Sequence, residues 1–130
     1  MPQAHSYFEL DKWIDKWMKS PPIIATLHSK IVGFAEFEPN GHIDCFYVHH
    51  GFQGKGIGSF LINEIEFIAQ ENNINRIYAE VSITAKSFFE SKGFKTLKRQ
   101  TLEIRGQKLT NFAMVKITLR RFALNNHSKP

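Results

Sequence analysis

The sequence has very little sulfur chemistry and no long apolar run. Cys45 is the single cysteine among 130 residues, so neither an internal disulfide nor a multi-cysteine metal site can form. No stretch approaches the roughly 20 apolar residues of a membrane-spanning helix, and residues 1–6 lack the charged and apolar regions of a secretory signal. We therefore expect a cytoplasmic protein with no membrane partner.

Positive charge is present without being concentrated. Lysine and arginine number 17 against 12 acidic residues, a net charge of +5, but only Lys98-Arg99 and Arg120-Arg121 are adjacent. This scatter argues against a nucleic-acid partner, and a phosphate-bearing small molecule accounts for a mild positive bias equally well. The hydrophobic content of 42%, with 12 phenylalanines, is close to globular averages, so we expect residues 1–130 to form one domain.

Apolar periodicity predicts helices alternating with strands. A short amphipathic helix is expected from about Tyr7 to Lys19, ended by Ser20-Pro21-Pro22. Strands are expected at 23–28, 31–38, 43–48, 76–81, 94–104 and 109–119, and helices from the glycine-rich loop to about 72–73 and over 84–92. The strand, helix, strand order from 43 to 81 implies a parallel crossover. The predicted fold class is therefore α/β (α+β), a mixed sheet begun by antiparallel hairpins.

The loop Gln53-Gly54-Lys55-Gly56-Ile57-Gly58 lies between an expected strand and the start of the long helix. Alternating glycines allow several backbone N–H groups to turn inward with no Cβ in the way, which makes an anion-binding nest. The same N–H groups are the unpaired donors of the helix, whose N-terminus attracts a phosphate. Lys55 can add a full charge nearby.

Other phosphate-binding loops fit this segment poorly. A P-loop needs Lys-Ser or Lys-Thr after its last glycine, whereas Ile57 follows Gly56 and Ser59 follows Gly58. The dinucleotide pattern G-x-G-x-x-G is not matched either, and 130 residues cannot supply a doubly wound sheet with two nucleotide-binding halves. The remaining alternative is a tight, closely packed turn without a ligand.

The segment Tyr47 to Leu61 resembles the strand, loop and helix start of the GNAT superfamily of acetyl-CoA-dependent N-acyltransferases. Gln53, Gly56 and Gly58 match that family's Q/R-x-x-G-x-G/A signature. A second segment, Ser82 to Phe94, fits the family's N-x-x-A-x-x-x-Y-x-x-x-G-F spacing through Ala85, Gly93 and Phe94. The resemblance covers roughly residues 23–119 and implies a three-layer fold, a mixed β-sheet with flanking helices, in which the family's usual N-terminal strand is expected to be missing.

The resemblance also implies how acetyl-CoA, as co-substrate, is held. The pantetheine arm is expected to pair with the free backbone of Phe46, Tyr47 and Val48 as a pseudo-strand, and the Val48 N–H resembles the family's oxyanion donor. The expected cofactor-binding residues are Phe46, Tyr47, Val48, Gln53, Gly54, Lys55, Gly56, Ile57, Gly58, Ser59, Ala85 and Phe89.

The resemblance does not identify the proton donor for the departing thiolate. The family commonly uses a tyrosine on the second helix, but the matching residue here is Phe89, which carries no proton to donate. Ser82, Tyr47 or Tyr78 could serve instead, water could serve, or the domain binds acetyl-CoA without catalysing transfer. We expect direct transfer to an amine in a ternary complex, with a non-catalytic acetyl-CoA-binding or interaction module as the alternative.

Carboxylates on the strands are candidate bases for the acceptor ammonium. They are Glu36, Glu38, Asp44 and Glu80, of which Asp44 and Glu80 are favoured because their strands flank the expected opening. His42, His49 and His50 can titrate near neutrality, but with no cysteine or carboxylate at ligand spacing we expect no metal. The acceptor is left open between a small-molecule and a peptide amine. Trp13 and Trp17, if exposed, would favour a homodimer.

Overall fold

The computed structural model describes residues 14, 15 and 17–118. Most of the helix expected from Tyr7 onward lies outside them, as do Trp13, Leu119 and the C-terminal tail, but residues 14–15 and 17–19 are helical as expected. The elements that follow are β1 (Ile23–Leu27), β2 (Lys30–Phe37), β3 (Ile43–Val48), the 3-10 turn η1 (His50–Phe52), α2 (Ile57–Glu71), β4 (Arg76–Ser82), α3 (Lys86–Ser91), β5 (Lys95–Ile104) and β6 (Gln107–Ile117). None of the described helices is long and apolar enough to cross a membrane.

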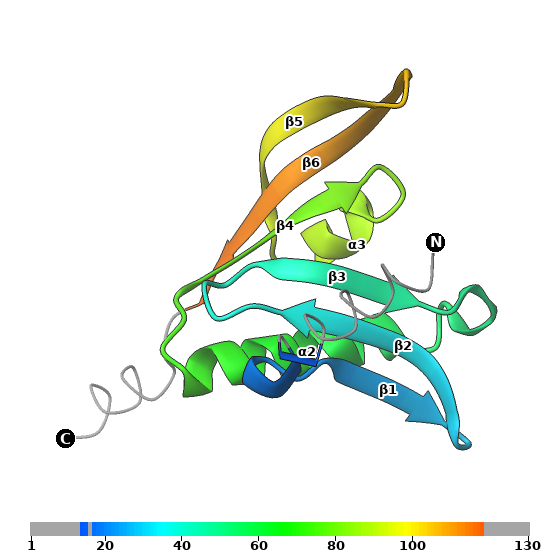
Figure 1. Cartoon of the computed structure of the whole chain (residues 1–130), viewed down its shortest axis with the longest axis vertical. Helices are drawn as coiled ribbons and strands as arrows, with labels where there is room; N and C mark the ends of the chain where they lie inside the picture. The colour runs from blue at the N-terminus through cyan, green and yellow to red at the C-terminus, as the bar shows by residue number, and fades with distance from the viewer. Residues whose placement is uncertain (1–13, 16, 119–130) are drawn as a thin grey trace.

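The first three strands form an antiparallel sheet in the order β1-β2-β3, and α2 packs against one face of it (Figure 1). The face of α2 that meets the sheet carries the buried residues Leu61, Ile62, Ile65 and Ala69. Leu61, Ile65 and Ala69 recur every four residues, so one helical stripe supplies the core contact. Burying each of the larger side chains contributes about 1.5–3 kcal/mol.

The last three strands form a second antiparallel sheet in the order β4-β6-β5. Its long β5–β6 hairpin extends beyond the body of the molecule (Figure 1). Arg105 and Gly106 connect the two strands, both at positive φ (54° and 77°), which is a two-residue hairpin turn. Because this turn is tight, β6 begins at Gln107, two residues earlier than the sequence pattern predicts.

The two sheets meet where β3 and β4 run parallel, as the crossover prediction required. The pairing is a single bridge between His42 and Tyr78, with the Tyr78 N–H donating to the carbonyl oxygen of Gly41 at 2.9 Å. Beyond this bridge the strands diverge toward their C-terminal ends, as Figure 1 shows. The expected mixed sheet is therefore two antiparallel sheets joined at one vertex, with α2 and α3 alongside.

A β-bulge sets the direction of the β3 backbone. Glu36 pairs with Cys45 and Phe37 with Ile43, so Asp44 is the additional residue. Farther along, the His49 N–H donates to the carbonyl oxygen of Val32 at 2.8 Å. Since N–H groups alternate sides along a strand, the N–H groups of Phe46 and Val48 point away from β2, toward the divergence between β3 and β4.

Candidate functional site

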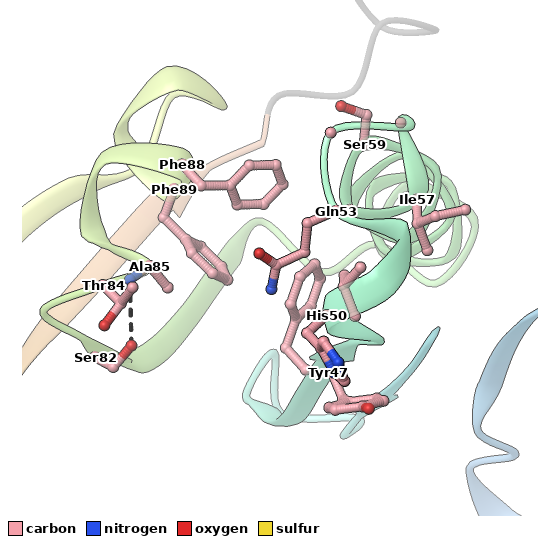
Figure 2. Close-up of a pocket in the computed structure, with 15 residues that line it drawn as sticks. Tyr47, His50, Gln53, Ile57, Ser59, Ser82, Thr84, Ala85, Phe88 and Phe89 are labelled. Atoms are coloured by element: carbon pink, nitrogen blue, oxygen red, sulfur yellow. Dashed lines mark hydrogen bonds between the residues drawn. The ribbon is translucent and has the colours of Figure 1, made fainter. Parts of the chain in front are cut away.

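A cavity of about 730 Å³ lies where β3 and β4 diverge. Figure 2 shows Phe88, Phe89, Thr84 and Ser82 on one side of it and Gln53, Ile57, Ser59 and His50 on the other. Its volume falls within the range of small-molecule sites in proteins. The residues that line it are Phe46, Tyr47, Val48, His50, Gln53, Gly54, Gly56, Ile57, Gly58, Ser59, Ser82, Thr84, Ala85, Phe88 and Phe89.

The first turn of α2 opens onto this cavity. Gly56 is the N-cap at φ 83°, and its carbonyl oxygen accepts the first helical hydrogen bond from the Phe60 N–H at 2.9 Å. No side chain caps the helix and its first turn carries no acidic residue. The N–H groups of Gly56, Ile57, Gly58 and Ser59 are the donors that an α-helix leaves without intrahelical partners. These residues line the cavity, so their donors and the helix dipole suit an anionic group.

The three glycines of the loop serve different purposes. A Cβ built at Gly54 or Gly56 would meet nothing within 4 Å, but both residues have positive φ (80° and 83°), a conformation that favours glycine. The open space around them is room for a ligand. At Gly58, by contrast, a Cβ would lie 2.8 Å from Cζ of Phe88. Gly58 therefore allows α3 to pack closely against the start of α2.

Aromatic rings form the wall of the cavity next to α3. The Phe46 ring lies 5.9 Å from that of Phe88 and 5.2 Å from that of Phe89, and Phe89 meets Phe94 edge to face at 5.1 Å. Phe89 is only 3% exposed and belongs to the hydrophobic core. The ring at this position is thus part of the core as well as of the cavity wall, and it brings no hydroxyl group.

Six polar side chains line the cavity beside this apolar wall: Tyr47, His50, Gln53, Ser59, Ser82 and Thr84. The Ser82 hydroxyl oxygen accepts a hydrogen bond from the Ala85 N–H at 3.2 Å, which holds the turn between β4 and α3 (Figure 2). His50 stacks on His49 with ring centroids 4.9 Å apart. Tyr78 lies outside the cavity, where its hydroxyl oxygen accepts a hydrogen bond from Asn40 at 3.2 Å.

An anionic cluster lies at the vertex where the two sheets meet. His42 Nδ1 is 2.7 Å from Glu38 Oε1, and His42 Nε2 is 2.7 Å from Glu80 Oε1. Burial lowers the pKa of His42, but the hydrogen bonds with Glu80 and Glu38 and their negative charges outweigh burial, so the net shift is upward from 6.5. Asp44 is exposed beside this group.

The fold brings together carboxylates that the sequence spacing did not reveal as potential metal ligands. Ligand-type atoms of Glu38, His42 and Asp44 lie within 4.8 Å of one another. Both ring nitrogens of His42 also lie within hydrogen-bond distance of carboxylate oxygens, Nδ1 of Glu38 and Nε2 of Glu80. The three histidines at 42, 49 and 50 do not form one cluster. His42 is hydrogen-bonded to Glu38 and Glu80, whereas His49 stacks on His50.

The structure gathers most of the residues that the sequence marked for the cofactor. All of them line the cavity except Lys55, which is exposed. Of the catalytic candidates, Val48 and Ser82 line the cavity, whereas Asp44 and Glu80 lie outside it, toward the vertex. Glu36 is buried on β2, where its Oε2 accepts a hydrogen bond from Trp17 Nε1 at 2.8 Å. His50, Thr84 and Phe88 line the cavity and were missed, although their neighbours in the sequence pointed to both segments.

The family described as "Acetyltransferase (GNAT) domain" matches residues 9–116 of this sequence. The chain therefore belongs to the GNAT family, and the resemblance found in the sequence is confirmed.

Individual relatives agree with this assignment. The chain is 33% identical over 114 residues to the uncharacterized N-acetyltransferase YafP of Escherichia coli (strain K12), covering 86% of this chain and 72% of YafP. A GCN5-related N-acetyltransferase from Rhodopseudomonas palustris superposes with a TM-score of 0.74 at 31% identity, covering 83% of this chain and 68% of that one. An acetyltransferase structure from Bacillus anthracis, solved in complex with acetyl coenzyme A, gives a TM-score of 0.66 at 25% identity, covering 74% of this chain and 61% of that one.

Proposed function

We propose that this protein transfers the acetyl group of acetyl-CoA to a primary amine by direct attack in a ternary complex. The observation that carries this proposal is the cavity between β3 and β4, which has unpaired helix N–H donors at one end and outward-turned strand N–H groups along one wall. A ligand with phosphates at one end and an amide-bearing arm at the other matches both features. Bound acetyl-CoA in the B. anthracis relative supports the same assignment.

In this proposal, different residues of the chain bind different parts of acetyl-CoA. The N–H groups of Gly56, Ile57, Gly58 and Ser59 hold the pyrophosphate, and the backbone of Phe46 and Val48 pairs with the pantetheine arm. Phe89, whose ring contacts that of Phe46, excludes water from the thioester end, where the transfer takes place, whereas Phe88 lies against Gly58 near the pyrophosphate. The Val48 N–H stabilises the developing oxyanion, because the strand geometry turns it toward the divergence.

The reaction requires two proton movements. An ammonium acceptor loses one proton before attack; the amine nitrogen then forms the N–C bond as the C–S bond breaks, and its second proton is lost while the thiolate gains one. Tyr47, Ser59, Ser82 and Thr84 carry the hydroxyl groups of the cavity, and Ser59 lies at the proposed pyrophosphate end. We therefore assign the donation to the thiolate to Tyr47, Ser82 or Thr84, or to bound water. A coenzyme A thiolate is a good leaving group near neutral pH, so the lack of a hydroxyl at Phe89 slows the reaction rather than abolishing it.

Binding of acetyl-CoA tests the cavity assignment. Gly56→Glu places a side chain and a negative charge among the N–H donors, so we expect isothermal titration calorimetry to show no acetyl-CoA binding. Gly106→Glu is the matched control, since Gly106 also has positive φ (77°) and open space around it but lies in the β5–β6 turn. Equal loss of binding in both variants, or undisturbed binding in Gly56→Glu, contradicts the assignment.

Release of free thiol tests the transfer. The wild-type protein is incubated with acetyl-CoA and benzylamine, putrescine or a short peptide with an N-terminal alanine, and the thiol is followed by a colorimetric reagent. We expect at least one amine to release thiol faster than acetyl-CoA alone. Binding of acetyl-CoA with no thiol release from any of them would instead identify a non-catalytic acetyl-CoA-binding module.

A further inference from the structure

His42 links two carboxylates that belong to different parts of the fold. Glu38 follows β2 directly, and Glu80 lies on β4, 38 residues farther along the chain than His42. Both contacts are 2.7 Å, the length of a strong, charge-assisted hydrogen bond. His42 is also the β3-side residue of the one parallel bridge between the sheets, so its ring lies at the vertex from which the strands diverge.

The two contacts fix the number of protons that the cluster holds. A carboxylate only accepts hydrogen bonds, and a neutral imidazole has one N–H. A neutral imidazole could therefore donate to only one of the two carboxylates. Two short hydrogen bonds require the protonated imidazole, which has an N–H at both ring nitrogens. When one of these protons leaves, one of the two hydrogen bonds is lost, and when a proton returns, the bond forms again. The arrangement is thus suited to taking up and releasing a single proton.

Glu80 connects the cluster to the cavity along β4. On β4 the buried Ile77, Ala79 and Val81 alternate with Tyr78, Glu80 and Ser82, so Glu80 and Ser82 share a face of the strand. Ser82 lines the cavity, and two residues along a strand span about 7 Å. The Glu80 side chain is 47% exposed, whereas that of His42 is 17% exposed. Glu80 is the most exposed of the three, since the Glu38 side chain is 32% exposed.

Resting on the proposed acetyl transfer, we propose that Glu80, His42 and Glu38 form a proton relay that serves acceptors arriving as alkylammonium ions. Glu80 takes the proton that the ammonium loses before attack, and His42 is a positioning residue that accepts this proton from Glu80 while Glu38 orients its ring. The proton then passes to solvent. The substrate class is therefore a cationic primary amine, whose charge also suits the neighbouring carboxylate of Asp44.

The surroundings of His42 favour the protonated ring. Glu38 approaches from the end of β2, Asp44 from β3 and Glu80 from β4. The Tyr78 ring lies against the imidazole at a tilt of 35°, with centroids 4.9 Å apart, and the Arg76 guanidinium lies over Tyr78, 4.7 Å from its ring centroid. The pKa of His42 is lowered by burial and raised by the two carboxylates, which prevail, so the relay gains its proton-accepting form as the pH rises through that raised value.

The test compares His42→Gln and Glu38→Gln with wild type, using the fastest alkylamine among benzylamine, putrescine and the alanyl peptide. We expect His42→Gln to lower kcat about 10²-fold or more while acetyl-CoA binding is unchanged. In Glu38→Gln the rising limb of kcat against pH should move to lower pH, because one of the two bonds that hold the proton on His42 is removed. Aniline, which is already neutral at these pH values, should lose less rate in both variants.

The outcomes separate this inference from the proposed function. If acetyl-CoA does not bind, or no amine releases thiol, the proposed transfer fails first. If transfer occurs, any of three results would contradict the relay. These are a wild-type kcat in His42→Gln, an unshifted rising limb of the kcat–pH profile in Glu38→Gln, or a reduction of kcat with aniline as large as with the alkylamine. Should His42→Gln fail to fold by circular dichroism, the Glu38→Gln profile decides, since this variant keeps the shape of the side chain.

Discussion

A Cβ built on Gly58 would lie 2.8 Å from Cζ of Phe88, a separation that real side chains do not adopt. Gly58 is in the first turn of α2 and Phe88 is on α3, so the contact joins the two helices that flank the cavity. The third glycine of the loop is thus needed for packing between helices. It is also what keeps the Phe88 ring at the cavity wall.

We predict that Gly58→Ala weakens acetyl-CoA binding. The added methyl group must displace the Phe88 ring, and overpacking of this kind costs about 1–3 kcal/mol of stability. Calorimetry should show a higher Kd, and urea unfolding a lower midpoint. The double variant Gly58→Ala/Phe88→Leu should recover part of both losses, because leucine leaves room for the methyl group. A double variant no better than the single one would show that the contact is not the cause.

A hydroxyl group restored at position 89 should increase turnover. Phe89 lines the cavity, so Phe89→Tyr places a proton donor in its wall without changing the backbone. We predict a higher kcat in the thiol-release assay, by up to about 10²-fold. Phe88→Tyr is the matched control, since Phe88 also lines the cavity but lies against Gly58. Equal gains in both variants, or none in Phe89→Tyr, would contradict a missing proton donor.

How far the sequence predicted this site depends on whether the interacting residues are close along the chain. Gln53 to Ser59 form one continuous strand-to-helix connection, and local chemistry was enough to mark it. Gly93, which matches the family spacing directly after the helix expected at 84–92, likewise has a positive φ of 94°, a conformation that favours glycine. The contacts of Gly58 with Phe88 and of His42 with Glu80 join residues 30 or more positions apart. No periodicity or motif encodes them, because they arise only when the two sheets meet.

The same reasoning explains what the strand pattern could not show. The pattern predicts a regular strand at 43–48, but the bulge makes Asp44 the additional residue of the β2–β3 pair. The parallel crossover was predicted correctly, yet its reduction to one bridge depends on the twist and packing of both sheets. The cavity forms because β3 and β4 separate after this single bridge, so its shape could not be predicted from the order of the elements.

Lys116 joins three elements of the described fold. Its Nζ bonds to the Glu66 carboxylate on α2 and donates to the Lys92 carbonyl oxygen after α3 at 2.7 Å. We predict that Lys116→Met lowers the free energy of unfolding by about 1–3 kcal/mol, because a half-buried carboxylate and a helix-end carbonyl lose their partner. Urea unfolding measures this loss. In a double-mutant cycle with Glu66→Gln the effects should be less than additive; full additivity would mean that the pair contributes nothing.

The contribution of His42 to stability should decrease as the pH rises. The carboxylates of Glu80 and Glu38 raise the pKa of His42 in the folded state above its ordinary value, despite the opposing effect of burial. A raised folded-state pKa stabilises the fold fully below the unfolded-state value, about 6.5, and this stabilisation is lost as the pH increases through the folded-state value.

We therefore predict that the difference in unfolding free energy between wild type and His42→Gln is largest below about pH 6.5 and becomes smaller above the folded-state pKa. Urea unfolding of both proteins across this interval measures the difference directly. His28→Asn is the control, because it replaces an exposed histidine in the β1–β2 turn, where φ is 52° and asparagine is tolerated. Its difference from wild type should stay constant over the interval. A difference for His42→Gln that stays constant or increases with pH would mean that the two carboxylates do not hold a proton on this ring.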